Sequence, residues 1–395
     1  MLQLRSLAMA PSTSDRFSPD VRKIAEEVFG SEAEETLQAL TSPVSEYFVR
    51  CNTNKISPDE LKHRLKDRGV LVDQHPMIKE ALSFPVKGPF DVPAYSRNIV
   101  VDKRTAESVL QGANVYAPGI IDCNSMREGD EVSVRSEFGE LLASGKTLMG
   151  ATEVLTFKKG LVVRIDKRRF NTIQIRELPE FQAGLLYPQS LAAMTTSRIL
   201  DPKPGETIVD MNCAPGGKLS HLSQLMDNLG RIYGFDRNQE KISQTRKVIS
   251  QLGCMNVTLA IHDSRYLHED VSSLEADKVL IDPPCSALGL RPKIYDFSET
   301  KRIKSLSSYQ TQFISTASKI VKPGGTIVYS VCTFSPEECE QVVEQATKDL
   351  NLKVIEQNPI VGARSGLTNF TSGRFCQRFD PRTDEIGYFI AKFQR

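Results

Sequence analysis

The stretch Ile208-Val209-Asp210-Met211-Asn212-Cys213-Ala214-Pro215-Gly216-Gly217-Lys218 decides the fold class. Apolar residues run into a glycine turn, and the helical spacing of Leu219, Leu222 and Leu225 begins directly after it. Glycines let the backbone approach a ligand closely, and the first turn of a helix presents free N–H groups. The stretch is neither a GxGxxG motif nor a P-loop. It predicts a nucleotide-like ligand, with a ligand-free turn as the alternative.

Strands and helices alternate from about residue 173 onward. This alternation predicts a doubly wound, Rossmann-like α/β sheet with parallel strands, whose ligands lie at the carboxyl ends of the strands. A helix is expected over 238–252, where Gly253 ends it. The strands are expected at 207–211, 231–236, 257–261, 278–282 and 326–331.

Acids and thiols stand at the ends of these expected strands. Asp236 is placed to bind ribose hydroxyls, and Asp263 is placed to reach an adenine amino group. Asp282-Pro283-Pro284-Cys285-Ser286 ends the fourth strand, where two prolines hold an acid and a thiol in a rigid loop. Ser330-Val331-Cys332-Thr333 ends the fifth strand with a second thiol at the same edge. Incidental acids and structural cysteines are the alternative interpretation.

Two thiols and an acid at the site of a methyl donor favour methylation of cytosine at carbon-5. Carbon-5 is a poor nucleophile, but a thiolate that adds to carbon-6 makes it enamine-like, so that it can attack a sulfonium methyl group. The proton on carbon-5 must then leave, and the thiol must be eliminated. An acid that hydrogen-bonds ring nitrogen-3 and the exocyclic amine stabilises the adduct.

Two smaller regions precede the α/β region. Residues 21–92 suggest helices followed by strand, helix and strand, and they predict a small α+β unit. Residues 93–172 carry closely spaced glycine turns between short apolar runs, which predicts a small β-rich module. Residues 1–20 are expected to be a disordered start. Their first 14 residues hold one Arg and no acid, so a targeting segment is the alternative.

Composition excludes several classes of protein. The 395 residues suit two or three domains, and 50 Lys and Arg against 49 Asp and Glu exclude a global polycation but not a local basic face. No apolar run reaches the roughly 18 residues of a membrane helix. The eight cysteines form no CxxC pair. We therefore expect no membrane partner, no metal and reduced thiols in a cytoplasmic protein, with a mitochondrial form left open.

The α/β region, over roughly residues 173–395, resembles the Nop/Sun (NSUN) RNA cytosine-5 methyltransferases. The resemblance is carried by Asp210, Pro215-Gly216-Gly217-Lys218, Asp236, Asp263, Asp282-Pro283-Pro284-Cys285-Ser286 and Ser330-Val331-Cys332-Thr333. Residues 93–172 resemble a PUA RNA-binding domain through Val101-Asp102, Ala106, Gly112-Ala113, Ala117-Pro118-Gly119 and Gly129-Asp130-Glu131-Val132. This order of domains resembles the PUA-containing subgroup of the family.

The resemblance implies an S-adenosylmethionine-dependent methyltransferase domain with an inserted PUA domain. It implies Cys332 as the thiolate nucleophile, Cys285 as the thiol that helps release the product, Asp282 as the group that holds the cytosine edge and Lys218 as a support of the pocket. The S-adenosylmethionine site would be lined by Asp210, Asn212, Cys213, Ala214, Pro215, Gly216, Gly217, Lys218, Asp236, Asp263 and Asp282.

The chain departs from the family pattern in two places. Asn212-Cys213-Ala214 precedes Pro215 where the family usually reads Cys-Ala-Ala, and Leu219 replaces the usual Thr. Because the glycines and Lys218 remain, cofactor binding is expected to survive. Val331 stands where a Thr usually precedes the nucleophile, which removes a hydroxyl contact near the thiol.

The resemblance also implies an RNA substrate. The family's substrates are tRNAs, methylated on an acceptor-stem cytosine close to the 3′ CCA end, together with some mRNAs that carry CCA-like loops. The PUA domain would read the CCA end. Apart from the resemblance, a monomer that binds one RNA is the default expectation. Two basic clusters, one near 158–176 and one in the loop after Cys285, suit phosphate contacts, although a solvated face is the alternative. The expected RNA contacts are Tyr116, Lys158, Lys159, Arg168, Arg169, Arg291 and Lys293.

Other functions remain as alternatives at this stage. In a DNA cytosine methyltransferase, Cys285 of the Pro-Cys pair would be the nucleophile. An RNA methyltransferase of the same kind can act on rRNA instead of tRNA. A catalytically idle RNA-binding scaffold is the third alternative, and the presence of both cysteines, Asp282 and Lys218 argues against it.

Overall fold

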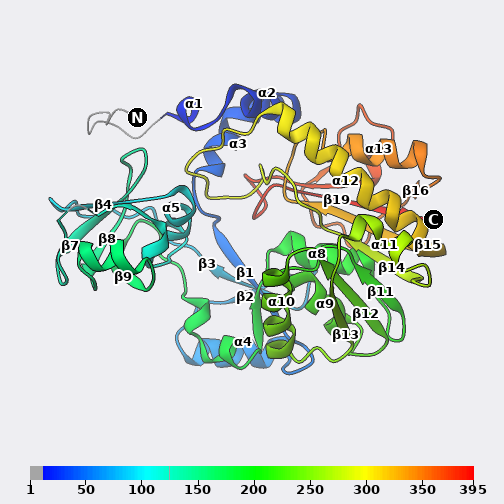
Figure 1. Ribbon diagram of the computed structural model, residues 1–395, viewed down its shortest axis with the longest axis horizontal. Coiled ribbons are helices and arrows are strands. Elements are labelled where there is room, and N and C mark those ends of the chain that lie inside the picture. The colour runs from blue at the N-terminus through cyan, green and yellow to red at the C-terminus, as the bar shows by residue number, and fades with distance from the viewer. Residues whose placement is uncertain (1–11, 124) are drawn as a thin grey trace.

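The computed structural model describes residues 12–123 and 125–395 and is built around one large mixed sheet (Figure 1). The strand order is β13-β12-β11-β14-β15-β19-β18-β17, and β16 also pairs with β19. Strands β11 to β15 run parallel, whereas β19 is antiparallel to β15. The strands are β11 Thr207–Asp210, β12 Arg231–Asp236, β13 Val257–Ile261, β14 Ala276–Ile281, β15 Val321–Val331, β16 Lys353–Val354, β17 Arg364–Ser365, β18 Gln377–Phe379 and β19 Tyr388–Gln394.

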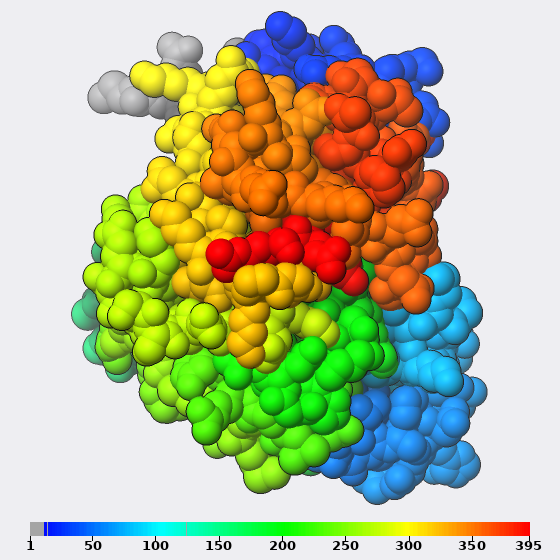
Figure 2. All heavy atoms as spheres, turned by 90° about the vertical axis from the view of Figure 1, so that its right-hand side faces the viewer, coloured from blue at the N-terminus to red at the C-terminus, as the bar shows by residue number. Residues whose placement is uncertain are grey.

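This strand order places a switch point beside β11. The chain adds β12 and β13 on one side of β11 and then crosses to add β14 and β15 on the other. Ligands of such sheets bind where the order reverses, outside the carboxyl ends of the strands. Figure 2 shows the C-terminal residues, in red, between orange and yellow segments, as the pairing of β19 with β15 and β16 requires.

Helices cover both faces of the sheet, which confirms the doubly wound α/β prediction. One face packs against α8, α9 and α10 through a core that includes Leu222 and Ile249. The other face packs against α11, α12 and α13 through a core that includes Phe313 and Val343. The helices are α8 Leu191–Leu200, α9 Gly217–Leu225, α10 Gln239–Leu252, α11 Leu267–Asp270, α12 Thr300–Ile320 and α13 Glu340–Asp349.

A second, four-stranded sheet has the order β10-β1-β3-β2. Strand β1 pairs antiparallel with both β3 and β10, so it is central. Strands β1, β2 and β3 precede the β-rich module in the chain, whereas β10 follows it, beyond the predicted boundary at residue 173. The module is therefore inserted between strands of one sheet. The elements are β1 Glu46–Cys51, β2 Asp73–Gln74, β3 Ala81–Pro85, β10 Leu186–Pro188, α4 Pro58–Asp67 and α7 Pro179–Gln182.

The inserted module is a six-stranded sheet of order β5-β9-β8-β7-β4-β6. Its own core contains Ile99, Val134 and Val163, and α5 packs against it through Val109. The elements are β4 Asn98–Val101, β5 Val115–Tyr116, β6 Ile120–Asp122, β7 Glu131–Ser136, β8 Leu141–Thr147, β9 Leu161–Arg168, α5 Lys103–Leu110 and α6 Ala151–Phe157. In Figure 1 the module lies to one side of the two sheets that share the rest of the chain.

The prediction of disorder for residues 1–20 does not hold from residue 12 onward. Phe17 is 2% exposed because it packs with Leu288 and Ile303, residues that lie far along the chain. Residues 1–11, which make up most of the predicted targeting segment, lie outside the described residues. The helices of this segment are α1 Thr13–Arg16, α2 Pro19–Phe29 and α3 Ala33–Leu40.

Short 3-10 helices complete the described elements: η1 Gly30–Glu32, η2 Ala117–Gly119, η3 Ile175–Glu177, η4 Ser264–Tyr266 and η5 Gly373–Phe375. Within residues 12–123 and 125–395, no helix has the length and apolar character needed to cross a bilayer. In the same ranges no group of three or more His, Cys, Asp or Glu side chains is arranged to hold a metal ion.

Candidate active site

The glycine turn after β11 forms the centre of the candidate site. Gly216 has a φ of 105°, a conformation that side chains rarely adopt, and Gly217 begins α9. Ala214 and Pro215 form the turn itself, while Cys213 packs beneath it with 3% of its surface exposed. The turn therefore presents the free backbone N–H groups of a helix N-terminus at the switch point.

Two polar side chains of this turn suit a bound cofactor. Asp210 is 1% exposed, and its Oδ1 accepts a hydrogen bond from the Asn212 backbone at 3.1 Å. Burial raises the pKa of Asp210 to about 7. The buried Oδ1 of Asn212 has no hydrogen-bond partner within the described ranges. An unpaired buried oxygen beside a glycine cradle fits a ligand with polar groups, as the S-adenosylmethionine prediction requires.

Asp236 is the last residue of β12, and Asp263 follows β13 by two residues at the same edge of the sheet. Oδ1 of Asp236 accepts from the Asn238 backbone at 2.9 Å, whereas its Oδ2 is 4.0 Å from Lys241 Nζ. Asp263 is held by Arg265, whose Nε and Nη2 donate to its two oxygens at 2.9 and 2.7 Å. These hydrogen bonds lower the pKa of Asp263. A nucleoside would therefore share the Asp263 carboxylate with Arg265.

The two predicted thiols lie in contact. Cys285, in the loop after β14, and Cys332, directly after β15, have their Sγ atoms 3.3 Å apart. A hydrogen bond from the Cys285 thiol lowers the pKa of Cys332; burial and the Asp282 carboxylate oppose this effect, and the Lys218 and Lys293 ammonium groups add to it. The same hydrogen bond, burial and the Glu338 carboxylate raise the pKa of Cys285. The site therefore favours a Cys332 thiolate beside a protonated Cys285.

Lys218 and Asp282 form an ion pair beside these thiols. Lys218 Nζ lies 2.6 Å from Asp282 Oδ2, and the two side chains are 14% and 30% exposed. Burial alone lowers the pKa of Lys218, but the Asp282 carboxylate outweighs burial and holds the pKa above its usual value. The Asp282 side chain is therefore covered only in part by the chain itself.

Tyr388 is a site residue that the sequence analysis missed. Its hydroxyl donates to Asp282 Oδ1 at 3.4 Å, and Ser330 Oγ donates to the same oxygen at 3.2 Å. Lys218 Nζ also lies 5.6 Å from the centre of the Tyr388 ring. Tyr388 begins β19, which pairs antiparallel with β15, and no sequence motif near the thiols indicates that this strand lies beside them.

Glu338 is a second missed residue, and it joins the two loops that carry the thiols. Its side chain is buried and accepts from the backbone of Ser286 at 2.9 Å, from Gln310 Nε2 at 2.9 Å and from Ser335 Oγ at 3.0 Å. Ser286 Oγ also donates to Glu338 and lies 2.8 Å from Thr333 Oγ1. Because Ser286 follows Cys285 and Thr333 follows Cys332, one carboxylate fixes both loops.

We expect Glu338→Ala to lower the free energy of unfolding by about 3 kcal/mol, because it leaves several buried donors unpaired. Urea titration of the full chain measures this loss. Glu338→Gln keeps the shape of the side chain and is expected to lose less. Glu240→Ala, at an exposed glutamate on α10, is the matched control and should be neutral. A Glu338→Ala variant as stable as the control would contradict the bridging role.

Arg291 and Lys293 do not fit the prediction that they contact RNA phosphates. The Arg291 guanidinium donates to the backbone oxygens of Ser42, Pro43 and Pro381, so its donors are used within the fold. Lys293 is 5% exposed, and its Nζ is paired with Asp296 Oδ2 at 2.8 Å. These two predicted contacts are corrected: both cations hold the loop after Cys285 against neighbouring parts of the chain, and neither is available to a phosphate.

The other predicted RNA contacts lie on the inserted module. Tyr116 is 54% exposed on β5 and pairs with Leu161 of β9, just after the exposed Lys158 and Lys159. These three side chains therefore share one region of the module surface. Arg168 and Arg169 are half-buried: Arg168 Nε donates to the Gly112 backbone at 3.2 Å, and Arg169 Nη1 lies 2.9 Å from Glu140.

The chain matches two protein-family models. Residues 197–394 match the model described as 16S rRNA methyltransferase RsmB/F. Residues 97–168 match the PUA domain model. The first match covers the large sheet with its glycine turn and both thiols, and the second covers the inserted six-stranded module.

Similar proteins are known over almost the whole length of the chain. The tRNA (cytosine(72)-C(5))-methyltransferase of Pyrococcus horikoshii is 36% identical over 98% of this chain and 99% of its own. The human tRNA (cytosine(72)-C(5))-methyltransferase NSUN6 is 28% identical, with 91% of this chain and 90% of its own covered. The crystal structure of Pyrococcus horikoshii NSun6 with SFG covers 96% of this chain and 98% of its own at a TM-score of 0.88 and 36% identity. The chain therefore belongs to the RsmB/F (Nop/Sun) family of S-adenosylmethionine-dependent RNA cytosine-5 methyltransferases and carries a PUA domain.

Proposed function

We propose that the protein forms 5-methylcytosine in the acceptor stem of tRNA, close to the 3′ CCA end, and that mRNA loops resembling CCA are further substrates. Two observations support a tRNA substrate: the full-length similarity to methyltransferases named for cytosine 72 of tRNA, and the inserted PUA domain. The observation that carries the chemistry is the contact between Cys332 and Cys285 beside the Lys218–Asp282 pair.

Cys332 is proposed to be the nucleophile. Its thiolate adds to carbon-6 of the target cytosine, and the electron pair of the 5,6 double bond makes carbon-5 nucleophilic. The lowered pKa of Cys332 supports this role, since only the thiolate form attacks. Asp282 holds the exocyclic amine and ring nitrogen-3 of the base, and the ion pair with Lys218 keeps Asp282 in place.

Cys285 is proposed to act when the adduct breaks down. After methylation the carbon-5 proton leaves, the electrons of that C–H bond re-form the 5,6 double bond, and the carbon-6 bond to Cys332 Sγ breaks to return the thiolate. The carbon-5 proton passes to water, and Cys285, whose Sγ is 3.3 Å from Cys332 Sγ, is placed to donate a hydrogen bond to the departing sulfur and so to ease the break of the carbon–sulfur bond. Its raised pKa suits a group that holds a proton at neutral pH.

The glycine turn is proposed to hold the cofactor. S-adenosylmethionine supplies an electrophilic methyl group when it is bound there. The lining proposed is Asp210, Asn212, Cys213, Ala214, Pro215, Gly216, Gly217, Lys218, Asp236, Asp263 and Asp282, and the unpaired Asn212 Oδ1 supports it. The departures at Asn212 and Leu219 leave the glycine turn and Lys218 in place.

The RNA face is proposed to lie on residues 93–172, the PUA domain, beside a catalytic domain over 173–395. Tyr116 stacks on a base of the CCA end, while Lys158 and Lys159 contact phosphates, with Arg168 and Arg169 beside them. We further propose a monomer that binds one RNA in the cytoplasm, with a mitochondrial form as the alternative.

Methyl transfer to defined transcripts tests this function. We expect labelled methyl from S-adenosylmethionine to enter a full-length tRNA transcript, and removal of the terminal CCA to reduce incorporation by about ten-fold or more, because the PUA contacts are lost. Bisulfite mapping then locates the modified cytosine in the acceptor stem. Greater incorporation into rRNA, which the name of the family model favours, would replace the tRNA assignment. Incorporation into DNA, or RNA binding without transfer, would favour the other two alternatives.

A further inference from the structure

Arg50 is a buried cation on the central strand of the four-stranded sheet. It lies on β1, in register with Ala81 of β3 and Tyr187 of β10, and its side chain is 1% exposed. Burial of a guanidinium group is costly unless its N–H groups are bonded. The groups that Arg50 contacts therefore indicate what the residue does.

The partners of Arg50 are neutral oxygen atoms: two belong to the start of α9, and the third is the side-chain oxygen of Gln189, just after β10. Nη1 donates to the backbone oxygen of Gly217 at 2.7 Å and to Gln189 Oε1 at 2.6 Å, and Nη2 donates to Ser220 Oγ at 2.7 Å. Ser220 Oγ in turn donates to the same Gly217 oxygen at 3.0 Å. The carbonyl of Gly217 is thus held by a cation from the N-terminal region and by a hydroxyl of its own helix.

Holding this carbonyl fixes an amide that faces the proposed cofactor site. The Gly217 oxygen and the Lys218 N–H belong to one planar peptide and point in opposite directions. The Lys218 N–H is one of the free donors at the N-terminus of α9, so the anchored oxygen sets the direction of that donor. Tyr187 limits the turn from another side, because a Cβ on Gly217 would lie 3.2 Å from its Cε1.

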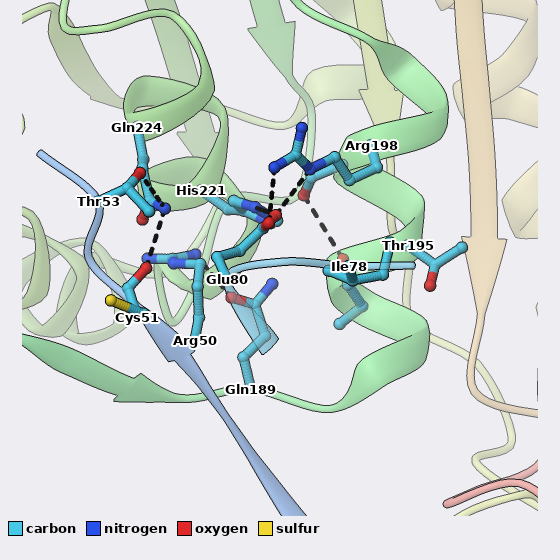
Figure 3. Close-up of polar contacts among 12 residues, drawn as sticks. Arg50, Cys51, Thr53, Ile78, Glu80, Gln189, Thr195, Arg198, His221 and Gln224 are labelled. Carbon is cyan, nitrogen blue, oxygen red and sulfur yellow. Dashed lines mark hydrogen bonds and ion pairs between the residues drawn. The ribbon is translucent and has the colours of Figure 1, made fainter. Parts of the chain in front are cut away.

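Arg198 is a second cation close to Arg50, and within the described residues it makes no hydrogen bond or ion pair with the glycine turn. Figure 3 shows Arg198 and His221 converging on Glu80, with Arg50 beside them. Arg198 donates to the two Glu80 oxygens at 2.7 and 2.6 Å, and His221 Nε2 lies 2.8 Å from Glu80 Oε1. Arg198 therefore serves as a matched control for the loss of a cation from this cluster.

We propose that Arg50 is a positioning residue for S-adenosylmethionine: by holding the Gly217 carbonyl it keeps the amide donors of the glycine turn directed at the cofactor. The N-terminal region is then part of the cofactor site and more than a support for the catalytic sheet. This inference rests on the proposed placement of the cofactor at the glycine turn.

Calorimetric titration with S-adenosylhomocysteine tests the proposal on the full chain. Arg50→Lys is expected to weaken binding about ten-fold, because one ammonium group cannot replace a guanidinium that bonds three oxygens in fixed directions. Arg198→Lys is expected to bind S-adenosylhomocysteine like the unchanged protein. Affinity for tRNA is expected to stay the same in both variants, since neither residue lies on the PUA domain.

Hydrogen exchange separates positioning from a general loss of stability. In Arg50→Lys the amides of residues 216–220 are expected to exchange faster, while those of α8 keep their protection. Should Arg50→Lys be insoluble, Ser220→Ala removes a milder contact to the same carbonyl and is expected to weaken binding about three-fold. Unchanged affinity in the folded variant, or an equal loss in Arg198→Lys, would overturn the proposal. If the unchanged protein fails to bind S-adenosylhomocysteine, the proposed function itself is contradicted.

Discussion

Replacing Cys332 by alanine is expected to abolish methyl transfer, with kcat reduced by a factor on the order of 10⁴ or more. Without the thiolate no adduct forms at carbon-6, and carbon-5 of cytosine stays too weak a nucleophile to take a methyl group. Single-turnover transfer of labelled methyl to a tRNA transcript measures the loss. Affinity for S-adenosylhomocysteine is expected to remain, because Cys332 lies after β15 and the glycine turn follows β11.

Cys339→Ala is the control for this change. Cys339 is a buried thiol of the same segment, but its Sγ lies 3.7 Å from the Thr333 backbone oxygen, and burial raises its pKa. We expect this variant to keep its activity and to lose only about 1 kcal/mol of stability. Equal losses of kcat in both variants would indicate damage to packing and would contradict the assignment of the nucleophile.

Asp282→Asn is expected to reduce kcat by about 10²–10³-fold, because the base loses a charged acceptor where the adduct needs stabilisation. The change also leaves the half-buried Lys218 without its anionic partner, since the ion pair at 2.6 Å is lost. Loss of a hydrogen bond between charged groups costs about 1.5–3 kcal/mol of stability. Steady-state kinetics and thermal unfolding of the same preparation separate the two effects.

Tyr388→Phe is the matched control for Asp282→Asn. It removes a 3.4 Å hydrogen bond to the same carboxylate but keeps the ring beside Lys218. We expect its kcat to fall by less than about ten-fold, since this hydrogen bond is long and the ion pair of the carboxylate with Lys218 remains. An Asp282→Asn variant that is folded and as active as Tyr388→Phe would exclude a direct role of Asp282 toward the base.

The sequence predicted the edge of the site well, because parallel strands bring their carboxyl ends together. Asp236 ends an apolar strand, and Asp263, Asp282 and Cys332 each follow one, so their common edge follows from the parallel direction of these strands. The glycine turn was predicted equally well from the sequence, since Gly216 needs a backbone conformation that few residues adopt.

Contacts between segments that are distant along the chain could not be predicted from local sequence patterns. Arg291 was taken for a free surface cation, but its guanidinium donates to the backbone oxygens of Ser42 and Pro43, which lie 249 and 248 residues away along the chain. Arg50 sits on an ordinary strand, and nothing in its sequence neighbourhood points to the carbonyl of Gly217, 167 residues later. Basic residues are normally exposed, so a buried cation is recognised only once its partners are in place.

Covalent trapping tests the central claim most directly. RNA that contains 5-azacytidine at the target position stays bound to the enzyme as an adduct, because the carbon-5 proton is absent and the release step is blocked. Proteolysis and mass spectrometry of the trapped complex then identify the linked cysteine. Our account predicts linkage through Cys332, retained in Cys285→Ala and absent when Cys332 is also replaced. Linkage through Cys285 in the unchanged protein would contradict it.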